Sequence, residues 1–398
     1  NMRKKKNAFT LIELLAVIVI LAVILVIAIP RILDVIETSK KDSFKTSAQL
    51  IADSAEKKYV TNKLNNIDEE ITCENVSKLS KEDYESCKIT IDEEGKATIN
   101  LVGKGKFDGY KCIGTNDNLA CGQVESITLP LNGKEYIEKL YNNELSRIEN
   151  GLKKDNTEDQ NIRYYGSNPN NYVRFNNELW RIIGVFGNNV KLVRKDSLGS
   201  LSWDSSESSV NGGYGVNEWS QADLKNYLNT MYYEGTSVTC YNEKNNQTTT
   251  CPANKLDETS KSLIDNHTWN IGAIDKTDTT IVNPETFAIN TVSFYKAERG
   301  TTNGKICNGR DACNDTVTRT TEWTGYIGLP YVTDWAYASS ESICETNMQK
   351  QDSSNAYICK NNNWMQRNTW TWYLSPVGNG SDAYNAWFVY GVGSSDGA

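Results

Sequence analysis

The sequence predicts an α+β protein in which a long N-terminal helix carries a small β-rich head and a larger, mainly β C-terminal domain. The chain begins with an apolar run that passes into a helical pattern, and short alternating runs typical of strands follow. All ten tryptophans lie between Trp180 and Trp387, which sets the C-terminal part apart in composition. A chain of 398 residues exceeds one ordinary hydrophobic core, so we expect two or three domains.

The N-terminal segment joins a basic start to a long apolar run. Residues 3–6 are Arg-Lys-Lys-Lys, and in the 21 residues from Phe9 to Ile29 only Glu13 is charged. At about 1.5 Å per residue, a helix of this length spans a hydrocarbon core of ~30 Å. The positive-inside rule keeps the basic residues in the cytoplasm. We therefore expect a transmembrane helix over residues 9–29, with the C-terminus outside.

The helical pattern continues as an amphipathic one beyond Pro30. Apolar positions recur at spacings of four, three, four and four, at Phe44, Ala48, Ile51, Ala55 and Tyr59. Proline lacks an N–H and its ring clashes with the carbonyl four residues earlier, so it kinks a helix that has reason to continue. The pattern predicts one helix over residues 9–62, with a kink at Pro30.

The junction Lys6-Asn7-Ala8-Phe9-Thr10-Leu11-Ile12-Glu13 resembles the cleavage and methylation motif of type IV prepilins. The resemblance implies that residues 1–8 are a cytoplasmic leader peptide, removed by a peptidase that cuts between Ala8 and Phe9. Phe9 then becomes the N-methylated terminus, with Glu13 and Pro30 at signature positions of the family. Ala8 stands where the family usually has glycine.

Glu13 is a carboxylate at membrane depth, which costs about 2.5–3.5 kcal/mol on insertion scales and is usually paired. The prepilin resemblance supplies a partner, because cleavage creates an α-amine at Phe9. In a filament of staggered helices, Glu13 of one subunit can meet the Phe9 amine of its neighbour. A plain signal anchor with a snorkelling Glu13 is the alternative, but it accounts for neither the Lys-Asn-Ala-Phe junction nor Pro30.

Residues 63–125 are expected to form the small β-rich pilin head. Residues 88–101 alternate polar and apolar side chains around Glu93-Glu94-Gly95, which predicts a hairpin. Residues 126–160 are interpreted as a connector with a short helix within 133–149. The polar stretch 151–160 is the predicted linker and domain boundary.

Residues 161–398 are expected to form a Trp-rich surface domain. Strand patterns over 172–175, 179–186 and 190–194 predict a β-meander, and residues 219–229 predict a helix with Ser220 as its N-cap.

Several stretches of this region resemble a family of bacterial surface modules. They are Asn171 to Val185, Trp219 to Asn229, Tyr326 to Leu329 and Trp372 to Pro376. Such modules look related to the C-type-lectin-like and sulfatase-modifying-factor fold, which this resemblance implies here. The modules usually close with an Arg-Pro-containing strand, whereas this sequence stops at Gly397-Ala398 without one.

The ten cysteines form local couples, all beyond the apolar segment. The couples are Cys73 and Cys87, Cys112 and Cys121, Cys240 and Cys251, Cys307 and Cys313, and Cys344 and Cys359. An even count in a chain with an export-type N-terminus predicts mostly disulfides within the couples. A zinc site would need CxxC pairs, which the sequence lacks.

The sequence offers no persuasive catalytic set. His267 is its single histidine, no Gly-rich phosphate loop precedes a helix, and the acids are scattered. We therefore expect no enzyme, cofactor or metal site. Trp364, Trp370, Trp372 and Tyr373 are denser than one core needs and are a candidate exposed platform for sugar rings. The net charge of −8 disfavours nucleic acid as a partner.

These observations favour a structural subunit of a type IV pilus-like filament that displays its C-terminal domain for adhesion. The expected partners are other copies or other pilins, the prepilin peptidase and methylase, the inner-membrane assembly machinery, and a glycan or protein ligand. The chain would reside in the cytoplasmic membrane as a prepilin and then in an extracellular pilus. The alternative is a pseudopilin of a type II secretion or competence system, and an enzyme displayed on a pilus is less favoured.

Overall fold

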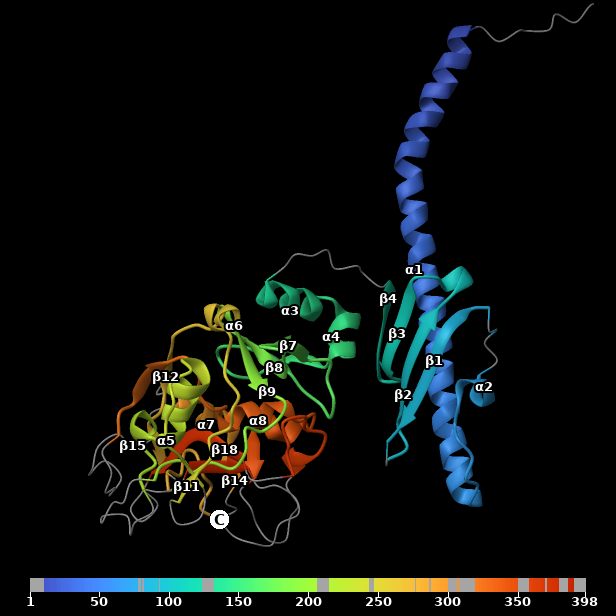
Figure 1. The fold of residues 1–398 in the computed structure, drawn as a ribbon. Helices are drawn as coiled ribbons and strands as arrows, with labels where there is room; N and C mark the ends of the chain where they lie inside the picture. Colours follow the sequence, from blue (N-terminus) through green and yellow to red (C-terminus); the bar gives the residue numbers. More distant parts are fainter. Residues whose placement is uncertain are drawn as a thin grey trace, which may run out of the picture. The chain divides into compact units, whose positions relative to one another are not determined.

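The computed structural model divides the chain into two compact units (Figure 1). The first comprises residues 1–129 and 143–148, and the second comprises 130–142 and 149–398. The structure describes residues 11–77, 80, 82–92, 94–123, 132–205, 215–242, 247–275, 277–285, 288–299, 306–307, 319–349, 358–368, 371–378 and 386–389. Within the N-terminal helix, side chains are described at Leu15, Val19 and from Val35 onward.

The first unit is a long helix packed on an antiparallel sheet. Helix α1 (Leu11–Asn65) contains 55 residues. The sheet has the order β1-β2-β3-β4, formed by β1 (Tyr84–Ile91), β2 (Ala97–Gly103), β3 (Tyr110–Thr115) and β4 (Asn118–Gln123). Two short helices, α2 (Cys73–Val76) and η1 (Gly105–Phe107), lie before and within it. Figure 1 shows the strands alongside the C-terminal half of α1.

The core of this unit follows from two periodicities. Phe44, Ala48 and Ile51 bury one face of α1, and alternate residues of β2, among them Ile99 and Leu101, bury one face of the sheet. The apolar stripe predicted on the helix is thus the stripe that packs. The predicted hairpin is also confirmed, because β1 pairs with β2 around the Gly95 turn.

Helix α1 continues through Pro30 and ends at Asn65, three residues beyond the predicted end. Asn66 follows with a φ of 52°, the left-handed conformation that commonly terminates helices. In the part of the chain whose residues are described, no helix is long and apolar enough to cross a membrane. Most side chains of residues 9–29 lie outside that part, so the transmembrane helix stays a prediction.

The second unit begins with helices and a five-stranded sheet. Its first elements are α3 (Gly133–Asn142), β5 (Leu152–Lys154), β6 (Ile162–Tyr164), β7 (Tyr172–Phe175), β8 (Glu178–Phe186) and β9 (Asn189–Arg194). Helix α4 (Glu144–Asn150) stands between α3 and β5, and most of its residues belong to the first unit. The strand order is β5-β6-β8-β7, and β9 also pairs with β8. The predicted meander over β7, β8 and β9 is confirmed.

The remainder of the second unit combines short helices with small sheets. Its helices are η3 (Trp219–Gln221), α5 (Asp223–Asn226), η4 (Tyr227–Tyr233), α6 (Glu258–Ser262), α7 (Thr291–Glu298), α8 (Val332–Ala338), η5 (Ser342–Glu345) and η6 (Ile358–Lys360). Three two-stranded sheets are formed by β10 (Cys240–Tyr241) with β11 (Thr248–Thr249), β12 (His267–Asn270) with β16 (Glu322–Gly325), and β14 (Ala288–Asn290) with β17 (Asn347–Gln349). A four-stranded sheet has the order β15 (Ile306–Cys307), β13 (Ala273–Asp275), β18 (Thr371–Gly378) and β19 (Ala386–Val389).

Aromatic side chains fill the core of the second unit. One cluster includes Phe294, Trp335, Trp364 and Tyr373, and another includes Trp180, Trp203, Trp219 and Tyr227. Trp203 and Trp219 meet edge-on with ring centroids 5.2 Å apart. The Trp-rich composition that predicted a separate domain therefore reflects its core.

Two local predictions in this unit are wrong. Residues 151–160 are no linker, since residues 152–154 form β5 and Asp155 and Thr157 are buried. The polar composition of this stretch suggested exposure to solvent, but its buried polar groups form hydrogen bonds with other polar side chains. Ser220 is no N-cap either, because the Glu218 carboxylate accepts from the Gln221 N–H and the Ser220 hydroxyl donates to Glu218.

Candidate functional site

The prepilin residues fall largely outside the described part of the structure. Ala8 and Phe9 lie outside the described residues, and Glu13 and Pro30 belong to α1 without described side chains. The backbone of α1 nevertheless relates two of these positions to each other. Glu13 and Pro30 lie on one continuous helix, so the charged position and the proline are held at a fixed helical offset.

The face of α1 that turns away from the sheet exposes large apolar side chains. Val35, Leu50, Val60 and Leu64 are 68%, 61%, 53% and 78% exposed. Because these exposed apolar side chains share one face of the helix, this face is suited to contact with another helix or a membrane surface.

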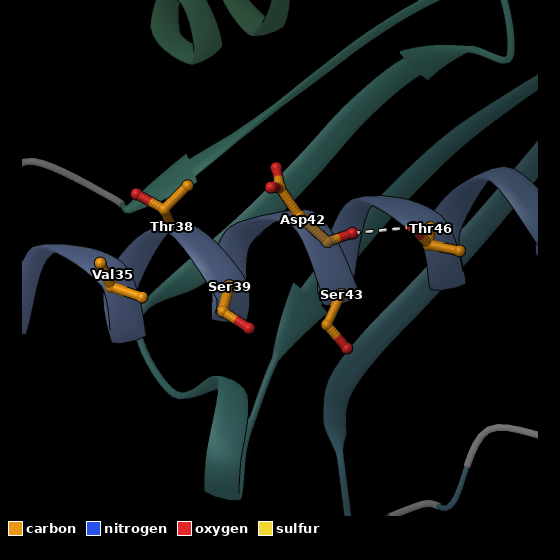
Figure 2. A pocket seen from close by; sticks show the side chains of 6 residues that line it. All are labelled: Val35, Thr38, Ser39, Asp42, Ser43 and Thr46. Carbon is orange, nitrogen blue, oxygen red and sulfur yellow. Dashed lines mark hydrogen bonds between the residues drawn. The ribbon is translucent and has the colours of Figure 1, made fainter. Parts of the chain in front are cut away.

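The N-terminal part of this face is hollowed (Figure 2). An open hollow of about 620 Å³ is lined by Val35, Thr38, Ser39, Asp42, Ser43 and Thr46. The Thr46 hydroxyl donates to the Asp42 carbonyl at 2.9 Å, which occupies that polar group within the helix itself. Four of the six lining residues are serine or threonine, whose small side chains permit close approach of another backbone.

The predicted aromatic platform is not exposed where the structure describes it. Trp364 and Tyr373 are only 8% and 1% exposed, and the Trp364 indole donates to the Tyr164 carbonyl at 2.8 Å. Trp372 is half-buried and packs on Trp203. Trp370 lies outside the described residues. The prediction is wrong for Trp364 and Tyr373, because this aromatic-dense segment supplies core side chains to β18 and the turn before it.

A different aromatic pair lies nearer the surface. The rings of Tyr233 and Tyr326 stack with centroids 4.0 Å apart and planes inclined by 10°, and both side chains are half-buried. Asn229 fixes the pair, since its side-chain oxygen accepts from the Tyr326 and Ile327 N–H groups. No sequence pattern indicated this pair, because the two tyrosines are far apart in the chain. His267 is exposed on β12, with its ring edge-on to Trp269 at 5.3 Å.

The structure also holds a buried ionic network that sequence reasoning missed. Arg163 is 1% exposed, and its Nε and Nη1 atoms donate to Asp155 and Asp334 at 2.6 and 2.9 Å. Lys191 donates to the other oxygen of Asp334 at 2.5 Å. The Arg163 guanidinium also lies 4.6 Å from the centre of the Tyr337 ring. A charged residue between apolar neighbours in Ile162-Arg163-Tyr164 was the only local hint.

The network sets the charge of its members. Burial alone would raise the pKa of Asp334, but Lys191, Arg163 and Arg299 outweigh it and lower the pKa to about 2. Burial lowers the pKa of Lys191 and raises that of Glu298, whose oxygens accept from Thr333 and Ser375. These groups pair with one another and join segments of the unit that are far apart in the sequence.

Four of the five predicted disulfides are formed. They link Cys73 to Cys87, Cys112 to Cys121, Cys240 to Cys251 and Cys344 to Cys359. Cys313 lies outside the described residues, so the fifth couple stays a prediction. Among the residues that the structure describes, no group of three or more His, Cys, Asp or Glu side chains is placed to hold a metal ion.

Comparison with known proteins bears on the N-terminus alone. Residues 3–29 match the prokaryotic N-terminal methylation motif. The match supports a type IV pilin-like or pseudopilin-like prepilin, and with it membrane insertion, a prepilin peptidase and pilin subunits as partners. Neither a curated protein nor a solved structure matches the chain. The resemblance of the C-terminal unit to lectin-like modules is therefore not supported by these comparisons.

Proposed function

We propose that the chain is a structural subunit of a type IV pilus-like filament that displays its second unit as a binding module. The observation that carries the proposal is the methylation motif at residues 3–29, which overlaps the start of a 55-residue helix. The C-terminal half of that helix packs on a four-stranded sheet. A long helix that carries a head on its C-terminal half is suited to a filament whose core is made of helices.

Assembly in this proposal depends on the helix. Cleavage between Ala8 and Phe9 frees an α-amine that Glu13 of a neighbouring subunit neutralises, which removes the cost of two charges in an apolar bundle. The exposed apolar side chains of α1 and its hollow would then be covered by neighbouring helices. Mass spectrometry of assembled protein should find N-methyl-Phe9 as the first residue, and an intact Met2 on assembled protein would contradict this route.

The second unit is proposed to bind a glycan or a protein outside the cell, without catalysis. Its buried Asp155 and Asp334 are held in ion pairs with Arg163, and its half-buried Tyr233–Tyr326 stack offers an amphipathic surface of the kind that contacts sugars or peptides. The size of the unit favours display, because about 250 residues on every subunit would be bulky in a thin filament. A minor or tip subunit fits this bulk best.

A pseudopilin of a type II secretion or competence system is the second candidate, since the motif is common to both kinds of filament. Electron microscopy of cells labelled with an antibody against the second unit distinguishes the pilus hypothesis from the pseudopilus hypothesis. Labelled surface filaments, evenly or at their tips, would support the pilus proposal. Labelling confined to the cell envelope, with no external filament, would favour the pseudopilin.

A further inference from the structure

Residues 152–161, which we name the strap, enter the second unit directly after its last chain connection to the first. That connection lies at residues 148–149. The strap starts with β5, which among the described strands is an edge strand and pairs with β6 through Leu152, Lys153 and Lys154. In an antiparallel hairpin pulled from its end, such pairs open one after another. Backbone pairing alone would therefore peel readily.

Side-chain contacts tie the strap to distant parts of the chain at two places. At the first, the Lys153 ammonium lies 2.7 Å from the Glu345 carboxylate and donates to the Ser339 carbonyl at 3.2 Å. The Asn156 amide donates to the Glu345 carbonyl at 3.0 Å and accepts from the Tyr337 hydroxyl at 2.7 Å. We call this set the Glu345 anchor.

The second tie is formed by Tyr295 of α7. Its hydroxyl donates to Asp159 at 2.6 Å and accepts from the Asn161 amide at 2.8 Å. Tyr295 is 3% exposed, and the Arg299 guanidinium lies 3.6 Å from the centre of its ring. We call this set the Tyr295 anchor. Within the span of the Glu345 anchor, Asp155 accepts from Arg163, which also donates to Asp334.

Both anchors end on well-fixed parts of the unit. Glu345 follows Cys344, which is bonded to Cys359, and both cysteines belong to the core cluster around Trp335. Tyr295 follows Phe294 of the same cluster. A force on the strap therefore passes sideways into the core and a disulfide, instead of along the hydrogen bonds of β5.

We propose that the strap is a mechanical clamp, whose Glu345 and Tyr295 anchors carry tension from the chain before residue 152 into the core of the second unit. The proposal rests on the proposed function only for the source of that tension, which is a filament that pulls on a bound module. It assigns a role to polar residues that otherwise suggest a flexible linker.

Constant-force measurements on single molecules of the full chain in detergent, with the disulfides intact, test the clamp. DNA handles attached through non-natural residues at Glu149 and Ile358, both exposed, load the strap against the Cys344–Cys359 segment. Under constant force, Lys153→Met and Asn156→Ala should each shorten the time for which the strap stays attached to the rest of the unit. The expected factor is about ten for Lys153→Met, which removes the ion pair with Glu345. Lys154→Met is the matched control, because this adjacent side chain is exposed, points to the other face of β5 and contacts the Tyr141 ring instead of either anchor.

Hydrogen exchange in the same variants separates a clamp from a general fault in folding. In Lys153→Met, amides of residues 152–156 should exchange about tenfold faster while those of β7 to β9 keep their protection. Wild-type lifetimes in Lys153→Met and Asn156→Ala would overturn the clamp, as would an equal loss in Lys154→Met. Loss of protection throughout β7 to β9 would overturn it too. None of these outcomes depends on filament formation, so the proposed function is tested separately.

Discussion

The two units bury different kinds of surface. In the first, α1 and β1 to β4 enclose aliphatic and aromatic side chains, as in the contact of Phe44 with Phe107 at 4.9 Å. In the second, aromatic clusters surround buried ions, with Arg163 and Asp334 each about 1% exposed. The first is held by apolar contacts along one helix. The second depends on charges that come from segments more than a hundred residues apart.

This difference shows which features of the fold can be predicted from patterns in the sequence. An apolar side chain at every third or fourth position predicts a buried helix face, and the folded chain buries that face. A lysine or an aspartate usually indicates a position exposed to solvent. Only the folded structure shows that Lys191 and Asp334 form an ion pair in the interior. Predictions from the sequence should therefore fail more often in the second unit, as the linker prediction did at residues 151–160.

The largest effect is expected from the helix of the first unit, in Glu13→Ala. Filament assembly should be lost, because the Phe9 amine of the neighbour would remain unpaired in an apolar bundle. Both units should keep their folds and the four described disulfides, since residue 13 precedes every strand of the sheet. Sheared filaments counted by electron microscopy provide the measure, and Glu13→Gln tests the charge alone. Wild-type filament numbers in Glu13→Ala would refute the pairing.

The buried network should make the second unit fragile to a single change of charge. Asp334→Asn keeps the shape of the side chain but leaves Arg163 and Lys191 short of a counter-charge, so we expect a loss of about 3–5 kcal/mol. All ten tryptophans lie at or beyond Trp180, so tryptophan fluorescence during urea unfolding follows this unit alone. An unchanged midpoint would show that the network contributes little.

Acid should act on the second unit through the same residue. The pKa of Asp334 is lowered from 3.8 to about 2 in the folded chain, so the folded state binds fewer protons than the unfolded state between these values. This stabilisation is present above pH 4 and is lost as the pH falls through 2, by about 2 to 3 kcal/mol once the pH is below both values. The pKa of Asp155 is lowered too, which adds to the loss. Urea midpoints measured from pH 5 to pH 2.5 should fall more steeply in the wild type than in Asp334→Asn.

How far the sequence could predict the molecule follows from the same contrast. The helix, the β1–β2 hairpin, the three meander strands and four disulfides were predictable, because periodicity, turn residues and local cysteine spacing determine them. The strap and the burial of Trp364 were not. Their contacts, such as Lys153 with Glu345 and Trp364 with Tyr164, join residues about 190 to 200 positions apart.

The smallest effect is expected from an exposed ion pair of the first unit. Lys106 lies 2.9 Å from Asp83, and its side chain is 61% exposed, so water screens the pair. Lys106→Met should therefore change the stability of the first unit by less than about 1 kcal/mol. The same substitution at Lys191, which is 15% exposed and paired with Asp334, should cost several times more because it leaves a carboxylate buried with one partner fewer. Hydrogen exchange resolved by peptide follows both units in one experiment. If the two lysine variants cost the same, burial would not be what distinguishes the ion pairs of the two units, and the contrast between their cores would have to rest on apolar packing alone.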